Sequence, residues 1–150
     1  SGWAKLGLDM SRKITPPPLG RAAREPDTLA PDGSKIRLLA TETQGATRAS
    51  LCEVRLDAGA VSRPVRHRSI EEIWYVTAGR GHVWRCPPDG EAQPVDVGAG
   101  DTLVIPTGWD FQFSAAPDTE LRFLCYASPP WPGPDEALPA ERGALGKPTI

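Results

Sequence analysis

The chain has 150 residues, enough for one compact domain and too few for two domains of ordinary size. Its 17 basic and 19 acidic residues leave a formal net charge of −2, so it lacks the overall basic charge typical of nucleic-acid-binding proteins. No apolar run approaches the ~20 residues of a membrane-spanning helix, and the first residues contain no apolar segment typical of a secretory signal. These features predict a cytoplasmic protein that binds neither nucleic acid nor membrane.

The three cysteines, Cys52, Cys86 and Cys125, are odd in number and include no C-x-x-C pair. Each lies in an apolar segment, so we interpret them as small buried side chains in a reducing compartment. A thiolate nucleophile or ligand at one of them is the alternative.

Proline and glycine interrupt the chain throughout, with 17 prolines and 15 glycines. They leave almost no window in which a helix could run for three turns, so the fold is expected to be mostly β. Residues 1–30 indicate an extended N-terminal arm, stiffened by three prolines at 16–18.

From residue 31 onward, short strands alternate with turns. The second predicted strand shows the period of a half-buried strand, because Cys52, Val54 and Leu56 alternate with charged residues. The predicted strands are 36–40, 47–56, 73–77, 82–86, 95–97, 102–105, 111–114 and 121–126. This pattern predicts an all-β fold, a small antiparallel barrel or jelly roll over residues 31–128. The proline-rich residues 129–150 are expected to lie over the surface as a tail without regular structure.

Two spaced motifs stand within this strand pattern. Residues 59–79 follow the spacing G-x5-H-x-H-x3,4-E-x6-G in part, and residues 100–115 follow G-x5-P-x-G-x2-H-x3-N in part. The matching positions are Gly59, His67, Glu72 and Gly79 in the first motif and Gly100, Pro106 and Gly108 in the second. Together the motifs resemble those of the cupin family, whose members are small antiparallel β-barrels.

The resemblance implies a metal site inside the barrel, where cupins use three histidines and one glutamate to bind iron, manganese, nickel or zinc. Only His67 and Glu72 stand at ligand positions here, because Val65 and Phe111 occupy the first and third histidine positions. The whole chain has two histidines and cannot supply a third. We therefore expect a depleted site with either no cofactor or a weakly bound divalent metal.

Other side chains could complete this metal site. Asp110 is the expected third ligand if a β-bulge turns it inward, and an exposed acid in a turn is the alternative. His82 would be needed for a site of two histidines and one carboxylate, and Glu71 could replace Glu72 in another register. For His67 and Glu72 themselves, the alternative is a metal-free hydrogen-bonded pair inside the barrel.

The side chains expected around a ligand combine one cation with aromatic rings. Arg63 shares strand parity with His67 and would favour a carboxylate or phosphate, although a solvated loop is the simpler interpretation. Trp131 and Trp109 are expected at the pocket entrance. The predicted ligand-binding set is His67, Glu72, Arg63, Trp74, Trp109 and Phe111.

Two functions fit these residues. The first is a cupin barrel that binds a small polar or anionic organic molecule, with a depleted metal site. The alternative is a mononuclear metal-dependent enzyme of the dioxygenase or sugar isomerase/epimerase type with an atypical ligand set. We also expect a homodimer, because cupins commonly pair and because the arm around residues 14–29 could add to a partner's sheet edge.

Overall fold

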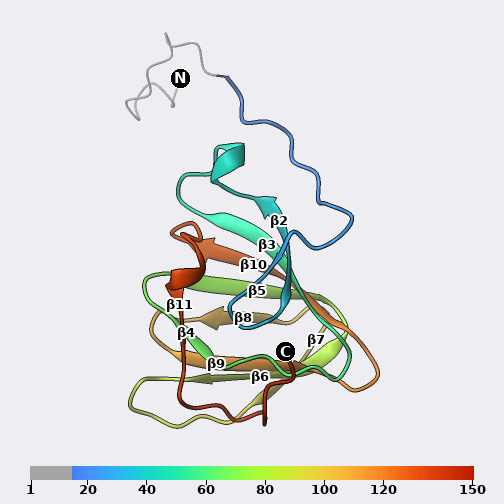
Figure 1. Ribbon diagram of the computed structural model, residues 1–150, viewed down its shortest axis with the longest axis vertical. Coiled ribbons are helices and arrows are strands. Elements are labelled where there is room, and N and C mark those ends of the chain that lie inside the picture. The colour runs from blue at the N-terminus through green and yellow to red at the C-terminus, as the bar shows by residue number, and fades with distance from the viewer. Residues whose placement is uncertain (1–14) are drawn as a thin grey trace.

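The computed structural model describes residues 15–150 (Figure 1). The first part of the expected arm, residues 1–14, lies outside the described residues. Residues 15–27 run as mostly exposed chain without regular structure, and the later part of this segment lies along β2, where Ala23 accepts a hydrogen bond from Arg37 and Asp27 donates one to Ile36. Within residues 15–150, no helix is long and apolar enough to span a membrane.

The regular secondary structure of the described chain is almost entirely β, as the sequence predicts. The strands are β1 (Thr28–Leu29), β2 (Lys35–Ala40), β3 (Ser50–Leu56), β4 (Val65–His67), β5 (Glu71–Ala78), β6 (Arg80–Cys86), β7 (Val95–Gly98), β8 (Thr102–Ile105), β9 (Asp110–Ala115), β10 (Leu121–Ser128) and β11 (Ala137–Pro139). Two short 3-10 helices, η2 (Glu42–Gln44) and η3 (Pro134–Glu136), lie in the connections.

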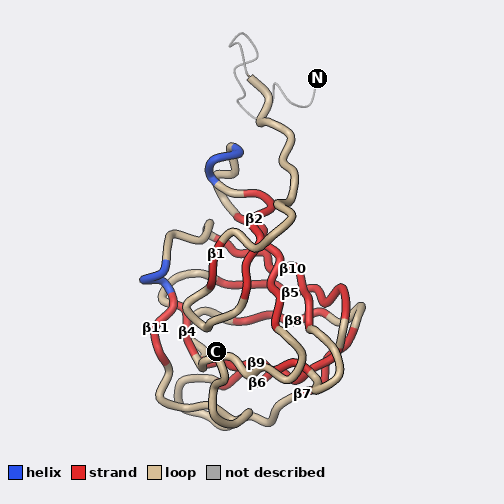
Figure 2. Tube along the Cα trace, turned by 45° about the vertical axis from the view of Figure 1, so that its right-hand side comes forward, coloured by secondary structure: helices blue, strands red, loops and turns tan. Residues whose placement is uncertain are grey.

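These strands form two facing antiparallel sheets (Figure 2). Sheet A has the order β1-β2-β3-β10-β5-β8, and sheet B has the order β11-β4-β9-β6-β7. Neighbours such as β3 and β10 are distant in sequence, which is the connectivity of a jelly roll rather than of simple hairpins. The predicted antiparallel jelly-roll barrel is therefore confirmed.

Aromatic side chains from both sheets fill the space between them. Trp74 of β5 stacks on Phe123 of β10 with ring centroids 4.2 Å apart, and it meets Phe113 of β9 edge-on at 5.2 Å. Aromatic pairs of this kind contribute about 0.5–1.5 kcal/mol each beyond the area that they bury. The strand alternation that buries these rings also determines which side chains point into the barrel.

The C-terminal residues 129–150 differ from the expected irregular surface layer. They form η3 and β11, and β11 adds to the edge of sheet B by pairing with β4 (Figure 1). Beyond β11 the chain crosses the outer face of sheet B, where the Gln112 side chain accepts hydrogen bonds from the backbone N–H groups of Ala144 and Leu145. This cover explains why every residue of β9 is buried on both faces of its sheet.

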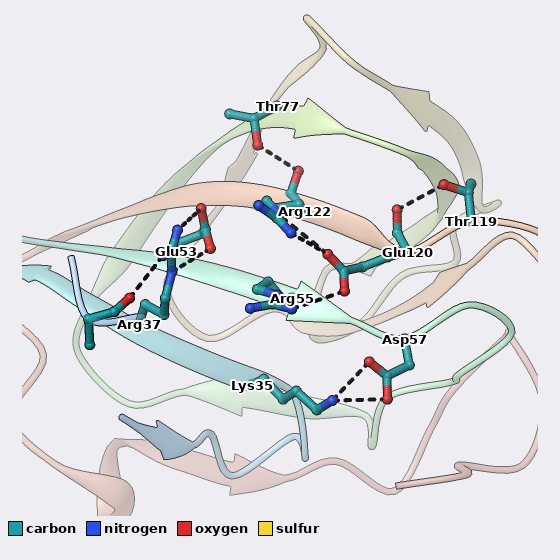
Figure 3. A network of polar contacts seen from close by, with 10 residues as sticks. Lys35, Arg37, Glu53, Arg55, Asp57, Thr77, Thr119, Glu120 and Arg122 are labelled. Atoms are coloured by element: carbon teal, nitrogen blue, oxygen red, sulfur yellow. Dashed lines mark hydrogen bonds and ion pairs between the residues drawn. The ribbon is translucent and has the colours of Figure 1, made fainter. Parts of the chain in front are cut away.

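The outer face of sheet A carries a network of ion pairs (Figure 3). Arg37 of β2 pairs with Glu53 of β3 through two hydrogen bonds of 2.8 Å. Glu120 accepts from both Arg55 and Arg122 further along the same face. These side chains are part-buried, with Glu53 7% exposed, so the pairs join β2, β3 and β10 across the outer face of the sheet.

Candidate functional site

His67 and Glu72 meet inside the barrel, on either side of the turn that joins β4 to β5. Burial alternates along both strands, so that His67 and Glu72 point inward while Arg66 and Glu71 face solvent. The imidazole Nε2 of His67 lies 4.0 Å from the Oε2 of Glu72, and the residues are 4% and 7% exposed. The two positions that match the family motif are therefore brought together.

Aromatic rings enclose this pair. The ring of Phe111 lies 5.0 Å from the His67 ring, and the ring of Trp131 meets it edge-on at 5.7 Å. The indole Nε1 of Trp74 donates a 3.0 Å hydrogen bond to the Oε1 of Glu72. A polar pair thus lies in a largely apolar surrounding, which disfavours charge on either side chain.

The pKa values of both side chains are shifted in the direction that favours the neutral form. Burial lowers the pKa of His67 to about 4, although the Glu136 carboxylate acts in the opposite direction. Burial raises the pKa of Glu72 to about 7, against the hydrogen bonds from Trp74 and Cys125. Near neutral pH, His67 is uncharged and Glu72 is close to half protonated, so their 4.0 Å approach is not a full ion pair.

His67 also has hydrogen-bonding capacity that the protein does not use. Its Nδ1 is buried and has no hydrogen-bond partner among residues 15–150. A buried polar atom without a partner costs about 1–3 kcal/mol, and such atoms are rare in native proteins. A small polar ligand could satisfy this nitrogen.

Glu136 supports the site, and sequence reasoning missed it. Its carboxylate accepts hydrogen bonds from the backbone N–H groups of Ser69 at 2.6 Å and Ile70 at 2.7 Å, in the turn between His67 and Glu72. Burial alone would raise the pKa of Glu136, but the hydrogen bonds from Ser69 and Ile70 outweigh it and hold the pKa below its usual value. Nothing in the motif spacing marks Glu136, because it lies far along the chain in the proline-rich segment.

Trp131 closes the same end of the barrel from the C-terminal segment. Its backbone N–H donates to the Oγ of Ser50 at 2.9 Å, and its side chain packs against the core. The ring of Trp131 therefore lies against His67, and its expected place at a pocket entrance stays a prediction.

Asp110, the expected third ligand, does not join the pair. β9 pairs with β4 in regular register, with Val65 opposite Phe111, so no bulge turns Asp110 inward. Its carboxylate lies on the outer face of sheet B and forms an ion pair with Arg142 at 3.0 Å. The β-bulge that would make Asp110 a ligand is therefore not present between β4 and β9.

The other candidate residues lie in different surroundings. Arg63 is exposed, and its Nε donates to the backbone oxygen of Ile150 at 2.9 Å rather than pointing into the barrel. His82 faces outward from β6 and lies 2.9 Å from Asp96. Trp109 is half-buried in the turn before β9, and Glu71 is exposed. Of the predicted ligand-binding set, only Trp74 and Phe111 accompany His67 and Glu72.

The residues present do not fit the metal centre that the family motif implies. In the described part of the chain, no three His, Cys, Asp or Glu side chains are grouped so that they could hold a metal ion. The Phe111 ring stands beside the imidazole at the position of the third family histidine and offers no lone pair. Two donors fall short of the three or four protein ligands that zinc sites use.

Hollows on the molecular surface lie away from this pair. One of about 640 Å³ lies between the arm and the segment around η2, lined by Pro17, Leu39 and Gln44 among others. Another of about 460 Å³ lies beside β7 and β8, lined by Arg85 and Asp101 among others. Neither includes His67 or Glu72, which are 4% and 7% exposed.

Comparisons with known proteins agree with this architecture. A family model described as "Cupin domain" matches residues 52–126, half of the chain. An uncharacterised protein of Methanocaldococcus jannaschii, MJ1618, is 29% identical over 108 residues, which cover 71% of this chain and 82% of that protein.

Solved structures show the same fold at low sequence identity. Oxalate decarboxylase from Bacillus subtilis has a TM-score of 0.71 and 18% identity, and covers 87% of this chain and 34% of its own. The coconut allergen cocosin has a TM-score of 0.62 and 23% identity, and covers 71% of this chain and 29% of its own. A formate complex of Lactobacillus farciminis oxalate decarboxylase has a TM-score of 0.62, 20% identity and coverage of 80% and 33%. The chain thus spans about a third of the length of these solved structures.

Proposed function

Because this chain belongs to the cupin family, we propose that its barrel binds a small organic acid between His67 and Glu72 without a metal. The observation that carries this proposal is the pair itself. The Nε2 of His67 lies 4.0 Å from the Oε2 of Glu72, whose pKa is about 7, and the Nδ1 of the same ring is buried with no hydrogen-bond partner among the described residues. Both groups are polar and inward-facing, and the unpartnered Nδ1 of His67 is costly unless a ligand completes it.

The protonation states define the class of ligand. A neutral imidazole offers one N–H donor and one acceptor, and a protonated carboxyl offers an O–H donor. A ligand carboxylate can accept from both groups, while the rings of Phe111 and Trp131 contact its apolar part. Arg63 is directed elsewhere and cannot offset the negative charge of the ligand. A protonated Glu72 carries no charge of its own, so it does not repel a ligand carboxylate.

Entry of the ligand requires movement of the C-terminal segment. Trp131 covers His67, and this segment is held by the hydrogen bond from Trp131 to Ser50 and by those that Glu136 accepts. These contacts bind the segment through a few points, whereas the sheets behind it are held by complete strand ladders. We infer that the segment 129–136 opens while the barrel keeps its shape.

The similar solved structures suggest which acids to test first. Their names mention oxalate and formate, and at 18–20% identity they share only the fold with this chain. Formate, acetate and oxalate form a series that differs in size and charge. The alternative of a metal-dependent enzyme needs a third donor that the described residues do not place beside His67 and Glu72.

The proposal is tested by titrating each acid into chelator-treated protein with isothermal calorimetry. We expect saturable binding that is weakened more than about tenfold by His67→Ala, about 1.4 kcal/mol. His82→Ala is the matched control, because this histidine faces outward from β6. Absence of saturable binding for all three acids, or equal affinity in both variants, contradicts the proposal.

A further inference from the structure

Two cysteines lie directly opposite each other in sheet A. β3 and β10 run antiparallel, and their register places Cys52 against Cys125. Both side chains point to the inner face, since the residues that alternate with them in phase, Val54 and Phe123, are core residues. Both cysteines are free thiols in this structure.

The register gives this pair the spacing of a disulfide. Directly opposite residues of an antiparallel pair have Cα atoms roughly 4.5 or 5.5 Å apart, depending on the hydrogen-bonding position. Disulfides span Cα separations of about 4.4–6.8 Å, so a bond between Cys52 and Cys125 requires no movement of the backbone.

We propose that Cys52 and Cys125 are a redox-active pair that forms a reversible disulfide on the inner face of sheet A. The third cysteine is excluded from this chemistry by its position. Cys86 is at the end of β6 in sheet B, and its thiol donates to the carbonyl groups of Pro87 and Gly90.

Exposure assigns the two roles. Cys52 is half-buried and reaches the side of sheet A where Leu38, opposite it on β2, is 45% exposed. Cys125 is buried, and its contact with Cys52 together with burial raises the pKa of its thiol well above the usual value. Cys52 is therefore the thiol that meets an oxidant, and Cys125 is the thiol that resolves the oxidised form.

The reaction requires a hydroperoxide as the two-electron oxidant. The Cys52 thiolate sulfur attacks one peroxide oxygen, the O–O bond breaks, and the other oxygen leaves as an alcohol or water after taking up a proton. The Cys125 sulfur then attacks the sulfenic sulfur of Cys52, the S–O bond breaks, and the leaving hydroxide takes the thiol proton to form water. A dithiol reductant reverses the bond by exchange.

The pair is connected to the proposed ligand site. Cys125 lies on β10, which pairs with β5, the strand that carries Glu72, and the Cys125 thiol lowers the pKa of the Glu72 carboxyl group. Disulfide formation removes the thiol hydrogen of Cys125, so oxidation changes the surroundings of the carboxyl group that a bound acid meets. This link rests on the proposed function, whereas the disulfide itself does not.

The experiment treats the folded Cys86→Ser protein with hydrogen peroxide and measures intact mass and peptide linkage without reductant. We expect a mass lower by two hydrogens, a cross-link between the peptides of Cys52 and Cys125, and recovery of both thiols with dithiothreitol. If Cys52 instead keeps an added oxygen after the peroxide treatment while Cys125 remains a free thiol, the proposal is overturned.

A second variant identifies the resolving residue, and a separate titration tests the link. Cys125→Ser should retain oxygen on Cys52 and show no loss of two hydrogens; an unchanged disulfide mass in this variant would refute the assignment. Calorimetry of acetate with the oxidised and the reduced Cys86→Ser protein should give affinities that differ at least about threefold. Equal, measurable affinities would refute the link while the mass result stands, and absent binding in both forms would count against the proposed function alone.

Discussion

The carboxylate of Glu136 accepts a 2.6 Å hydrogen bond from the backbone N–H of Ser69. It also accepts from the Ser69 hydroxyl group, whose Oγ lies 2.9 and 3.0 Å from the two carboxylate oxygens. This contact ties the C-terminal segment to the turn that separates His67 from Glu72. The position of the pair therefore depends on a residue that is distant from it in sequence.

Replacing Glu136 with alanine should destabilise the protein by about 2–4 kcal/mol, because the N–H groups of Ser69 and of the buried Ile70 lose their acceptor. Urea denaturation measures the effect. Glu141→Ala, in the exposed part of the same segment, is the control and should change the free energy of unfolding by less than about 0.5 kcal/mol. Equal effects of the two substitutions would show that the hydrogen bonds from Ser69 and Ile70 to Glu136 do not stabilise the turn.

The stability of the protein should depend on Glu72 between its ordinary pKa of 4.5 and its native value of about 7. Because the native pKa is raised, the stabilisation is present below 4.5 and is lost as the pH rises through 7. Glu72→Gln cannot lose a proton, so its free energy of unfolding relative to the unmodified protein should rise by about 3 kcal/mol across this range. A difference that stays constant with pH would contradict the raised pKa.

His67 should behave in the opposite sense at lower pH. Its native pKa of about 4 is below the ordinary 6.5, so its contribution is present above 6.5 and is lost as the pH falls toward 4. NMR of the imidazole resonances should show His67 still neutral at pH values where an ordinary histidine is charged. A midpoint for His67 near 6.5 would show that the ring is not desolvated as described.

Restoring the missing histidines should create a metal site. Val65 and Phe111 lie opposite each other on β4 and β9, and both point inward near His67. The Val65→His and Phe111→His double variant should bind zinc more tightly than the unmodified protein by more than about tenfold, as measured by competition with a chelating dye. The gain should disappear when His67→Ala is added, and its persistence would place the metal elsewhere.

The homodimer stays a prediction. The described part of the arm is exposed, with Leu19 80% exposed, and it leads into β1 at the edge of sheet A. Light scattering should show a dimer for the whole chain and a weaker dimer after removal of residues 1–27. A monomer at all concentrations would contradict the prediction, and an unchanged dimer after the deletion would contradict the role of the arm.

The sequence predicts the inward-facing pair well, because two local patterns agree on it. Strand alternation and motif spacing both place His67 and Glu72 inside a barrel, and neither depends on distant contacts. Ligation by Asp110 required a β-bulge, and the regular register of β9 with β4 leaves none. Bulges have no reliable sequence signal, so this detail depends on the three-dimensional structure.

The residues that support the site could not be predicted from local patterns. Glu136 and Trp131 reach His67 only because residues 129–139 fold back from sheet A to sheet B. The approach of Cys52 to Cys125 depends in the same way on the pairing of β3 with β10. In each case the contact is determined by topology, while the local composition indicates only loop or strand.

The central claim is that a neutral His67 and a protonated Glu72 bind an organic acid without a metal, and calorimetric titration of acetate into chelator-treated protein at a series of pH values tests it most directly. Because binding needs the proton on Glu72, the affinity should be constant well below its pKa of about 7 and fall about tenfold per pH unit above it. Glu72→Gln should remove this dependence. Affinity that does not change with pH, or binding that appears only after a divalent metal is added, would contradict the account.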